Sequence, residues 1–86
     1  MKTTENNNND RVSFNIVESL GVLSTSTNGW TKEVNVVSWN DRPAKLDIRD
    51  WDPDHNKMSR GIGLNATEVA GLYELLQNTE ISSLGI

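Results

Sequence analysis

Residues 44–51 read AKLDIRDW, and this stretch decides the fold class. Leu46 and Ile48 fall on one side of an extended chain, while the polar and aromatic residues between and beyond them fall on the other. Alternation with a period of two residues is typical of a β-strand that is buried on one face only. We therefore expect a strand with Leu46 and Ile48 on its core face and with Arg49 and Trp51 on the opposite, exposed face.

Three further segments have strand patterns, at residues 12–24, 30–39 and 59–64. Gly21 inside the first of them marks a bend or a bulge, as glycine within a strand often does. Asn28 and Gly29 form a strong hairpin signal after it, because both residues accept positive φ angles. Pro43 belongs to the turn before the third strand, where it limits pairing.

The last predicted element is a helix over residues 65–78. Asn65 is the expected N-cap, and Glu68 three positions later completes a capping-box pattern. Apolar residues then recur at helical spacing and form one stripe: Val69, Leu72, Tyr73 and Leu76. Four strands followed by one helix, without strand–helix–strand alternation, indicate an α+β domain in which the helix covers one face of an antiparallel sheet.

The length and composition indicate one small domain. Residues 1–11 are polar and rich in asparagine, so we expect a disordered tail there, a domain over residues 12–78 and a C-terminal tail over residues 79–86. A domain of this size buries only about 60% of the surface that its unfolded chain exposes. It is therefore marginally stable alone, and a partner subunit would help.

Several classes of protein are excluded by what the sequence lacks. There is no cysteine, so disulfides and thiolate metal sites are excluded. No apolar run approaches the roughly 18 residues of a membrane span, and no signal-peptide pattern opens the chain, so we expect a cytoplasmic protein without membrane contact. The net charge of −4 argues against nucleic-acid binding, but residues 30–60 balance six basic groups with six acidic ones.

The acidic loop after the third strand predicts neither a metal site nor an active site. Asp50, Asp52 and Asp54 have the first, third and fifth spacing of an EF-hand, but His55 and Gly61 stand where that loop needs glycine and glutamate. A polar turn in which aspartates cap local amides is the simpler interpretation. His55 is the only histidine and has no nucleophile beside it, so we predict no enzymatic activity, no metal and no cofactor.

The three tryptophans give the positive signal. Each lies in or at the end of a predicted strand, with basic residues close by: Trp30 with Lys32, Trp39 with Arg42 and Lys45, and Trp51 with Arg49. An aromatic ring beside cations on an exposed sheet suits single-stranded nucleic acid, because bases stack on the ring while the cations take the phosphates. RNA is a variant of this prediction, since stacking does not sense the 2′-hydroxyl.

Two alternatives stay open at this stage. In the first, some of the tryptophans are ordinary core residues, and Arg49 forms an ion pair with Asp47 or with a cross-strand acid. Strict alternation also places Lys32 and Trp39 on opposite faces of their strand. In the second, the sheet or the apolar helix face docks a protein partner, which makes the chain a protein-interaction module.

KLDIRDW at residues 45–51, followed by MSRGIGLNATEV at residues 58–69, resembles the signature of the transcriptional coactivators related to positive cofactor four. SLGVLSTSTNGWTKEVNVVSWNDRP, at residues 19–43, is similar to the bacterial, YdbC-like branch of that family. The resemblance covers about residues 13–77. It implies a curved four-stranded antiparallel sheet and one helix, paired through the helices into a homodimer whose groove holds single-stranded DNA with little sequence preference.

The resemblance also implies which residues bind. The strand arginine of the family corresponds to Arg49, and the aromatic residue after it corresponds to Trp51 with an ambiguity of one position. Arg42 and Lys45 are the nearest substitutes for the lysines that flank the family's second hairpin. With the other tryptophans and basic residues of the strands, the predicted nucleic-acid-binding set is Trp30, Lys32, Trp39, Arg42, Lys45, Arg49, Trp51 and Arg60.

The chain departs from the eukaryotic pattern of this family in two respects. An Asn-rich tail stands in place of a long Ser/Lys-rich arm, and Asp41 makes the second hairpin less basic, so we expect weaker binding or a stronger dependence on salt. The overall prediction is a homodimeric, sequence-independent single-stranded-DNA-binding protein of the cytoplasm and nucleoid. It would serve transcription regulation, replication or repair, together with the transcription or repair machinery.

Overall fold

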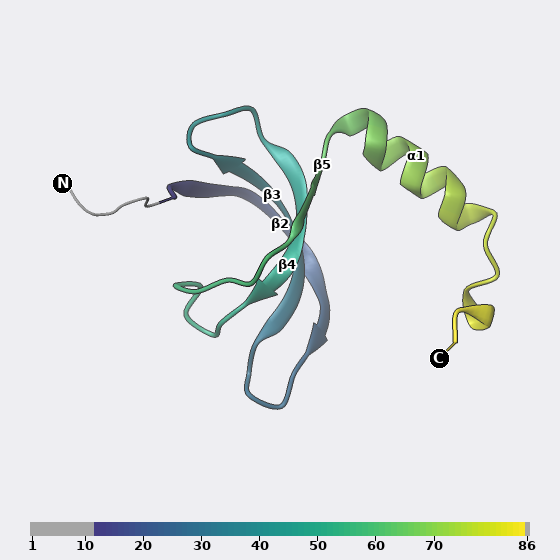
Figure 1. Ribbon diagram of the computed structural model, residues 1–86, viewed down its shortest axis with the longest axis horizontal. Helices are drawn as coiled ribbons and strands as arrows, with labels where there is room; N and C mark the ends of the chain where they lie inside the picture. The colour runs from purple at the N-terminus through teal and green to yellow at the C-terminus, as the bar shows by residue number, and fades with distance from the viewer. Residues whose placement is uncertain (1–11, 86) are drawn as a thin grey trace.

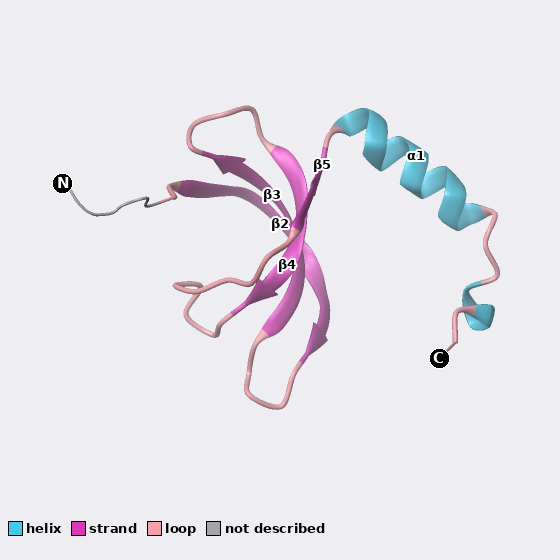
Figure 2. Ribbon diagram, in the orientation of Figure 1, coloured by secondary structure: helices cyan, strands magenta, loops and turns pink. Residues whose placement is uncertain are grey.

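The computed structural model describes residues 12–85 and confirms the predicted order of four strands and one helix (Figures 1 and 2). The elements are β2 (Phe14–Thr25), β3 (Thr31–Trp39), β4 (Lys45–Trp51), β5 (Ile62–Leu64) and helix α1 (Ala66–Gln77). The predicted disordered tail at residues 1–11, like residue 86, lies outside the described residues. After α1 the chain forms one short 3-10 helix, η1 (Ile81–Ser83).

The four strands form one antiparallel sheet in chain order, β2-β3-β4-β5, joined by turns whose residues accept unusual backbone angles. In the β2–β3 turn only Gly29 is left-handed, at φ 92°, and the Asn28 side chain instead accepts a hydrogen bond from the Trp30 backbone N–H at 3.1 Å. In the β3–β4 turn Asn40 and Asp41 have φ angles of 51° and 62°. Two consecutive left-handed residues match the twist of a tight hairpin.

Antiparallel pairing places cross-strand partners on the same side of the sheet, and this gives two faces of different composition. The groove face carries Glu33, Asn35, Val37 and Trp39 of β3 with Lys45, Asp47, Arg49 and Trp51 of β4. The apolar face carries Val34 and Val36 of β3, Leu46 and Ile48 of β4, and Ile62 and Leu64 of β5. Polar and aromatic residues therefore dominate one face, and aliphatic residues dominate the other.

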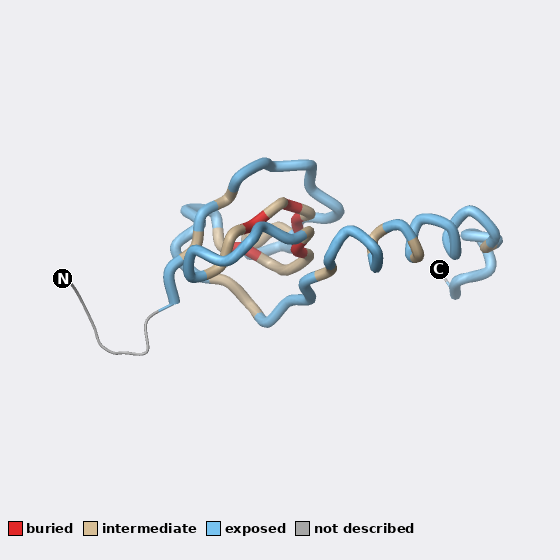
Figure 3. The backbone as a smooth tube through the Cα atoms, turned by 90° about the horizontal axis from the view of Figure 1, so that it is seen from above, coloured by how far each residue is buried: buried red, intermediate tan, exposed pale blue. Residues whose placement is uncertain are grey.

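Within one protomer, the prediction that Leu46 and Ile48 lie on the buried face is wrong. Both are only half-buried, whereas Trp51, Val37 and Asp47 on the groove face are fully buried. Figure 3 shows that the buried segments lie in the sheet and not in the helix. The sheet curls away from α1 (Figure 1), so side chains on its concave side converge and shield one another from water without a covering layer. Curvature, and not a helix, makes this face the core of the protomer.

Strand β2 contributes to the curvature. Its pairing with β3 shifts register at three places, and one of the shifts lies between Ser19 and Gly21, where the sequence predicted an irregularity. Register shifts of this kind bend a strand and increase its twist. The bent sheet brings Phe14 of β2 within 5.2 Å of Trp51 of β4, measured between ring centroids, although β3 lies between the two strands.

Helix α1 begins as predicted, but it does not cover the sheet of its own protomer. The Asn65 side chain accepts from the Glu68 N–H, and the Glu68 carboxylate accepts from the Asn65 N–H, both at 2.9 Å, which confirms the capping box. The helix touches chiefly the β4–β5 side of the sheet and projects outward (Figures 1 and 3). Its apolar stripe is therefore exposed, at 37% for Leu72, 65% for Tyr73 and 46% for Leu76.

A cavity of about 480 Å³ separates the helix from the apolar face. Its sheet side is formed by Val36, Leu46 and Leu64, and its helix side by Val69, Ala70 and Tyr73. Two apolar surfaces thus face one shared space that the protomer does not fill.

Candidate nucleic-acid interface

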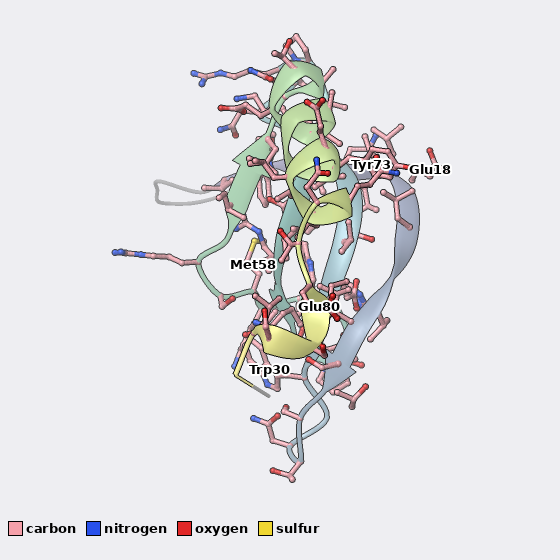
Figure 4. All side chains as sticks on the ribbon, turned by 90° about the vertical axis from the view of Figure 1, so that its right-hand side faces the viewer. Glu18, Trp30, Met58, Tyr73 and Glu80 are labelled. Atoms are coloured by element: carbon pink, nitrogen blue, oxygen red, sulfur yellow. The ribbon has the colours of Figure 1, made fainter. Side chains whose placement is uncertain are left out.

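A groove opens on the groove face beside the last residue of β3. It has a volume of about 470 Å³ and is lined by Val12, Trp39, Lys45, Asp47, Arg49, Met58 and Gly63. Met58, labelled in Figure 4, comes from the loop before β5. Gly63 pairs with Asp47 across β4 and β5, and because it has no side chain the groove stays open toward β5.

Trp39 forms the aromatic wall of the groove. It ends β3, is half-buried, and packs against its cross-strand partner Phe14 with ring centroids 5.7 Å apart. The Arg49 guanidinium carbon lies 4.4 Å from the Trp39 ring centroid, which is within cation–π range. The indole is therefore held by an aromatic ring and by a cation, and it remains partly open to solvent.

Arg49 is held in place by four acceptors. Its Nε and Nη2 donate to the two carboxylate oxygens of Asp47, both at 2.7 Å, and Nη1 contacts the Ser59 carbonyl oxygen at 3.3 Å and the Met58 sulfur at 3.5 Å. The Asp47 side chain is fully buried and that of Arg49 is 15% exposed. Bidentate arginine–carboxylate pairs of this kind are short and directional. The open alternative in which Arg49 pairs with Asp47 is the one that the structure adopts.

Gly61 provides the space that Arg49 occupies. A Cβ atom at this position would stand 2.5 Å from the Arg49 Cβ, 2.6 Å from its Nε and 2.6 Å from the Ile48 carbonyl oxygen. Such distances are shorter than real carbon contacts, so any larger residue would displace the arginine or the strand. Gly61 is thus a steric requirement of the arginine site.

A second cluster lies on the same face near the β2–β3 turn. Trp51 stacks on His55 with ring centroids 5.4 Å apart and an interplanar angle of 28°. The His55 Nε2 lies 2.9 Å from a carboxylate oxygen of Glu33, which also accepts from the Thr31 hydroxyl at 2.5 Å. The amide of Asn35 donates to the other Glu33 oxygen at 3.2 Å. Glu33 is therefore buried and well supplied with donors.

These partners decide how Glu33 titrates. Burial alone raises its pKa, but hydrogen bonds from Thr31, Asn35 and His55, together with the charge of His55, outweigh burial. The net result is that the pKa of Glu33 is held below its ordinary value of 4.5. The carboxylate is ionised at neutral pH and serves as a structural acceptor.

The structure brings three of the predicted binding residues together in the groove: Trp39, Lys45 and Arg49. Trp51 lies on the same face but is fully buried, so its ring has no free surface on which a base can stack in this conformation. The expectation that Trp51 is exposed is therefore wrong, and the alternative that some tryptophans are core residues holds for it. Curvature of the sheet is the physical reason.

The other four predicted residues lie outside the groove. Lys32 is on the apolar face, as strict alternation indicated, and its Nζ is 3.4 Å from the Asp50 carboxylate. Trp30 is half-buried next to the β2–β3 turn, and Arg42 and Arg60 are exposed in the loops before β4 and β5.

Sequence reasoning missed Phe14, Met58 and Gly61 as parts of the site. Phe14 lies in the first predicted strand segment, but the sequence does not show the register shifts that determine which residues it contacts. Gly61 lies in the MSRGIGLNATEV stretch that carries the family resemblance, but only the position of the Arg49 side chain explains why this position is a glycine. Met58 carried no signal of its own.

The acidic loop is a turn, as expected. The Asp52 carboxylate accepts from the backbone N–H groups of Asn56 and Lys57 at 2.8 and 2.9 Å, and His55 takes the left-handed position at φ 58°. Within residues 12–85 no group of three histidine and acidic side chains is placed to hold a metal ion. No helix in that same range is long and apolar enough to cross a membrane.

Comparison with known proteins adds two findings. Residues 26–75 match the family described as Transcriptional Coactivator p15 (PC4). The chain is also similar to an uncharacterized protein of Treponema pallidum (strain Nichols), with 42% identity over 73 residues that cover 85% of this chain and 86% of that protein. The family match spans β3, β4, β5 and most of α1, and hence both the groove face and the apolar face.

Proposed function

Because the chain belongs to the Transcriptional Coactivator p15 (PC4) family, we propose that it binds single-stranded DNA as a homodimer and with little sequence preference. The family indicates single-stranded DNA binding and transcription coactivation in general terms, and it is a family of nucleic-acid-binding proteins, not of enzymes. This membership confirms the resemblance on which the sequence prediction relied.

The observation that carries the proposal is the groove lined by Trp39, Lys45 and Arg49. It offers a partly exposed indole beside basic groups, which is the combination that single strands use for stacking and phosphate contact. A duplex keeps its bases stacked on one another, so it gains nothing from an aromatic wall. The groove therefore favours unpaired strands, and RNA is an acceptable variant of the same ligand.

The homodimer is supported by the apolar surface that one protomer leaves open. The helix stripe is exposed, the apolar face is half-buried, and an apolar cavity lies between them. In residues 12–85 only Val37 and Trp51 are buried apolar residues, which is a small core for an independent domain. A second copy that packs its helix against this surface would complete the hydrophobic core of both chains.

A homodimer would carry two grooves, one in each protomer. We propose that it protects or presents unpaired strands in the cytoplasm and nucleoid, during transcription regulation, replication or repair, in contact with the machinery of those processes. The exposed helix stripe also favours the protein-interaction alternative, in which a different protein covers the same surface.

The test is fluorescence anisotropy of a labelled oligo-dT, compared with a duplex of equal length at two salt concentrations. We expect binding to the single strand, weak or absent binding to the duplex, and lower affinity at higher salt. Equal binding to both ligands, or to neither, would refute the proposal and favour a protein partner. Sedimentation of the free protein gives the oligomeric state in the same buffers.

A further inference from the structure

We propose that Asp47 is a positioning residue that withdraws Arg49 from phosphate binding, so that the groove holds single strands chiefly by their bases. In this proposal Arg49 supports the Trp39 ring, and Lys45 makes the phosphate contact. The inference rests on the proposed function. It assigns different roles to the two basic residues of the groove, which their residue types alone do not indicate.

The hydrogen bonds of Arg49 carry the first step. A guanidinium has five N–H donors, and the contacts to Asp47, Ser59 and Met58 engage both ends of the group. At most one donor remains free in the described structure. A phosphate that approached this donor would also approach the Asp47 carboxylate, whose charge cancels that of the arginine.

Confinement carries the second step. The pair is largely shielded from water, with Arg49 15% exposed and Asp47 fully buried. Gly61 lies so close that the arginine packs directly against the backbone that leads into β5. To reach a phosphate, the side chain would have to leave a buried carboxylate without its counter-charge, which is strongly unfavourable.

The position of Trp39 shows what the held arginine does instead. The guanidinium lies 4.4 Å from the Trp39 ring centroid, and Phe14 packs on the same indole from β2. Two neighbours restrict the rotation of the indole before any ligand arrives, so less conformational entropy is lost when a base stacks on it. Asp47 thus acts on the ligand through Arg49 and Trp39.

Lys45 is the cation left for the ligand. Among the residues that line the groove, Lys45 is the one basic residue besides Arg49, and it is exposed. Each phosphate contact on a single strand contributes a slope of about −0.7 to the plot of log affinity against log salt concentration. One contact per groove therefore predicts a shallow contribution from the groove, with stacking as its main source of affinity.

The experiment measures that slope for oligo-dT with the full-length protein and matched variants. In Asp47→Asn the arginine keeps its place but loses its counter-charge, so we expect the slope to steepen by about 0.7 per groove. Asp50→Asn makes the same chemical change on the apolar face, where Asp50 pairs with Lys32, and should leave the slope unchanged. Lys45→Met should make the slope shallower by about the same amount.

The double variant Asp47→Asn/Arg49→Gln replaces the ion pair by two amides that can bond to each other. If Asp47→Asn alone does not fold, this double variant still tests whether Arg49 contacts phosphate. The proposal requires the double variant to keep the wild-type slope, because no phosphate contact is lost. A slope shallower by about 0.7 per groove in the double variant would overturn it, because Arg49 would then be a phosphate ligand.

Failure of the inference can be told apart from failure of the proposed function. Wild-type protein that does not bind oligo-dT at all would overturn both. A second outcome would overturn the role of Asp47 alone. In it the wild-type protein prefers the single strand, the salt slope is unchanged in Asp47→Asn, and the slope is shallower in the double variant. Circular dichroism of each variant shows that the compared proteins are folded.

Discussion

The groove face buries the polar side chains of Glu33, Asn35 and Asp47, whereas the aliphatic side chains of Leu46 and Ile48 on the apolar face are only half-buried. The groove face thus buries polar groups within one protomer, whereas the apolar face is less completely covered. The groove face satisfies most of its charged and hydrogen-bonding groups inside one protomer, apart from the buried Asn35 Oδ1 and Trp51 Nε1 atoms, which have no hydrogen-bond partner within residues 12–85. The apolar face and the helix form the two walls of an open pocket, so a chain that covered this pocket would add to the stability of the apolar face.

The largest expected effect distinguishes core from ligand surface on the groove face. Trp51→Ala removes a fully buried ring that packs on Phe14 and His55, so we expect it to destabilise the fold by about 3–5 kcal/mol. Urea unfolding measures this free energy. If the variant keeps its stability and loses only oligo-dT binding, the ring is a ligand surface and the assignment of the core to this face is wrong.

The second prediction tests the apolar face. Leu46→Asp puts a carboxylate on the apolar face, and burying this polar group without a partner at the interface should weaken dimerisation by about 1–3 kcal/mol per protomer. Analytical ultracentrifugation over a concentration series measures the shift. Leu23→Asp, at an exposed position near the far end of β2, is the matched control and should leave the dimer intact. A wild-type protein that sediments as a monomer at all concentrations would refute the homodimer.

The third prediction isolates the groove. Trp39 is half-buried and lines the groove, so Trp39→Ala should reduce oligo-dT affinity by about 1–3 kcal/mol for each base that stacks there. Trp39→Phe should recover part of the loss, because it keeps an aromatic face. Anisotropy titration is the measurement, and Trp30→Ala serves as the control outside the groove. Equal losses in the two alanine variants would argue against a specific stacking site at Trp39.

The smallest expected effect concerns the stability of the fold at acid pH. Since the pKa of Glu33 is lowered in the folded state, its ionised form stabilises the fold fully above the ordinary pKa of 4.5, and this stability is lost as the pH falls below that value. Thermal unfolding between pH 7 and pH 3 should therefore show a decrease in Tm over the acid range. In Glu33→Gln that part of the decrease should disappear; an identical pH profile in both proteins would remove Glu33 as its source.

Local signals were sufficient to predict the elements of the fold. The alternation of residues 44–51, the Asn28–Gly29 turn and the Asn65–Glu68 capping box all depend on residues within one short stretch of chain. Interactions of this range leave a pattern in the sequence, and the structure confirms the strands, the turn position and the helix start. The pattern also grouped Arg49 and Trp51 on one face correctly.

Side-chain partners were less accessible to the sequence. Periodicity shows which residues share a face, but it contains no information on the direction in which the sheet curls. In the structure the register shifts of β2 contribute to the curvature, and Trp51 is buried while Trp39 stays partly open. The sequence left open whether Arg49 binds a ligand or pairs with Asp47, because an arginine next to an acidic residue is compatible with both.

The sequence by itself therefore determined the four strands, the capped helix, the family and the three residue types that a single-strand groove needs. The tertiary structure alone decided which face is concave, that the helix leaves its apolar stripe exposed, and that Arg49 is bound by Asp47 against the backbone of Gly61. The reason is physical. Backbone propensities and helix caps act between residues that are close in the sequence, whereas burial and ion pairing depend on the curvature of the whole sheet.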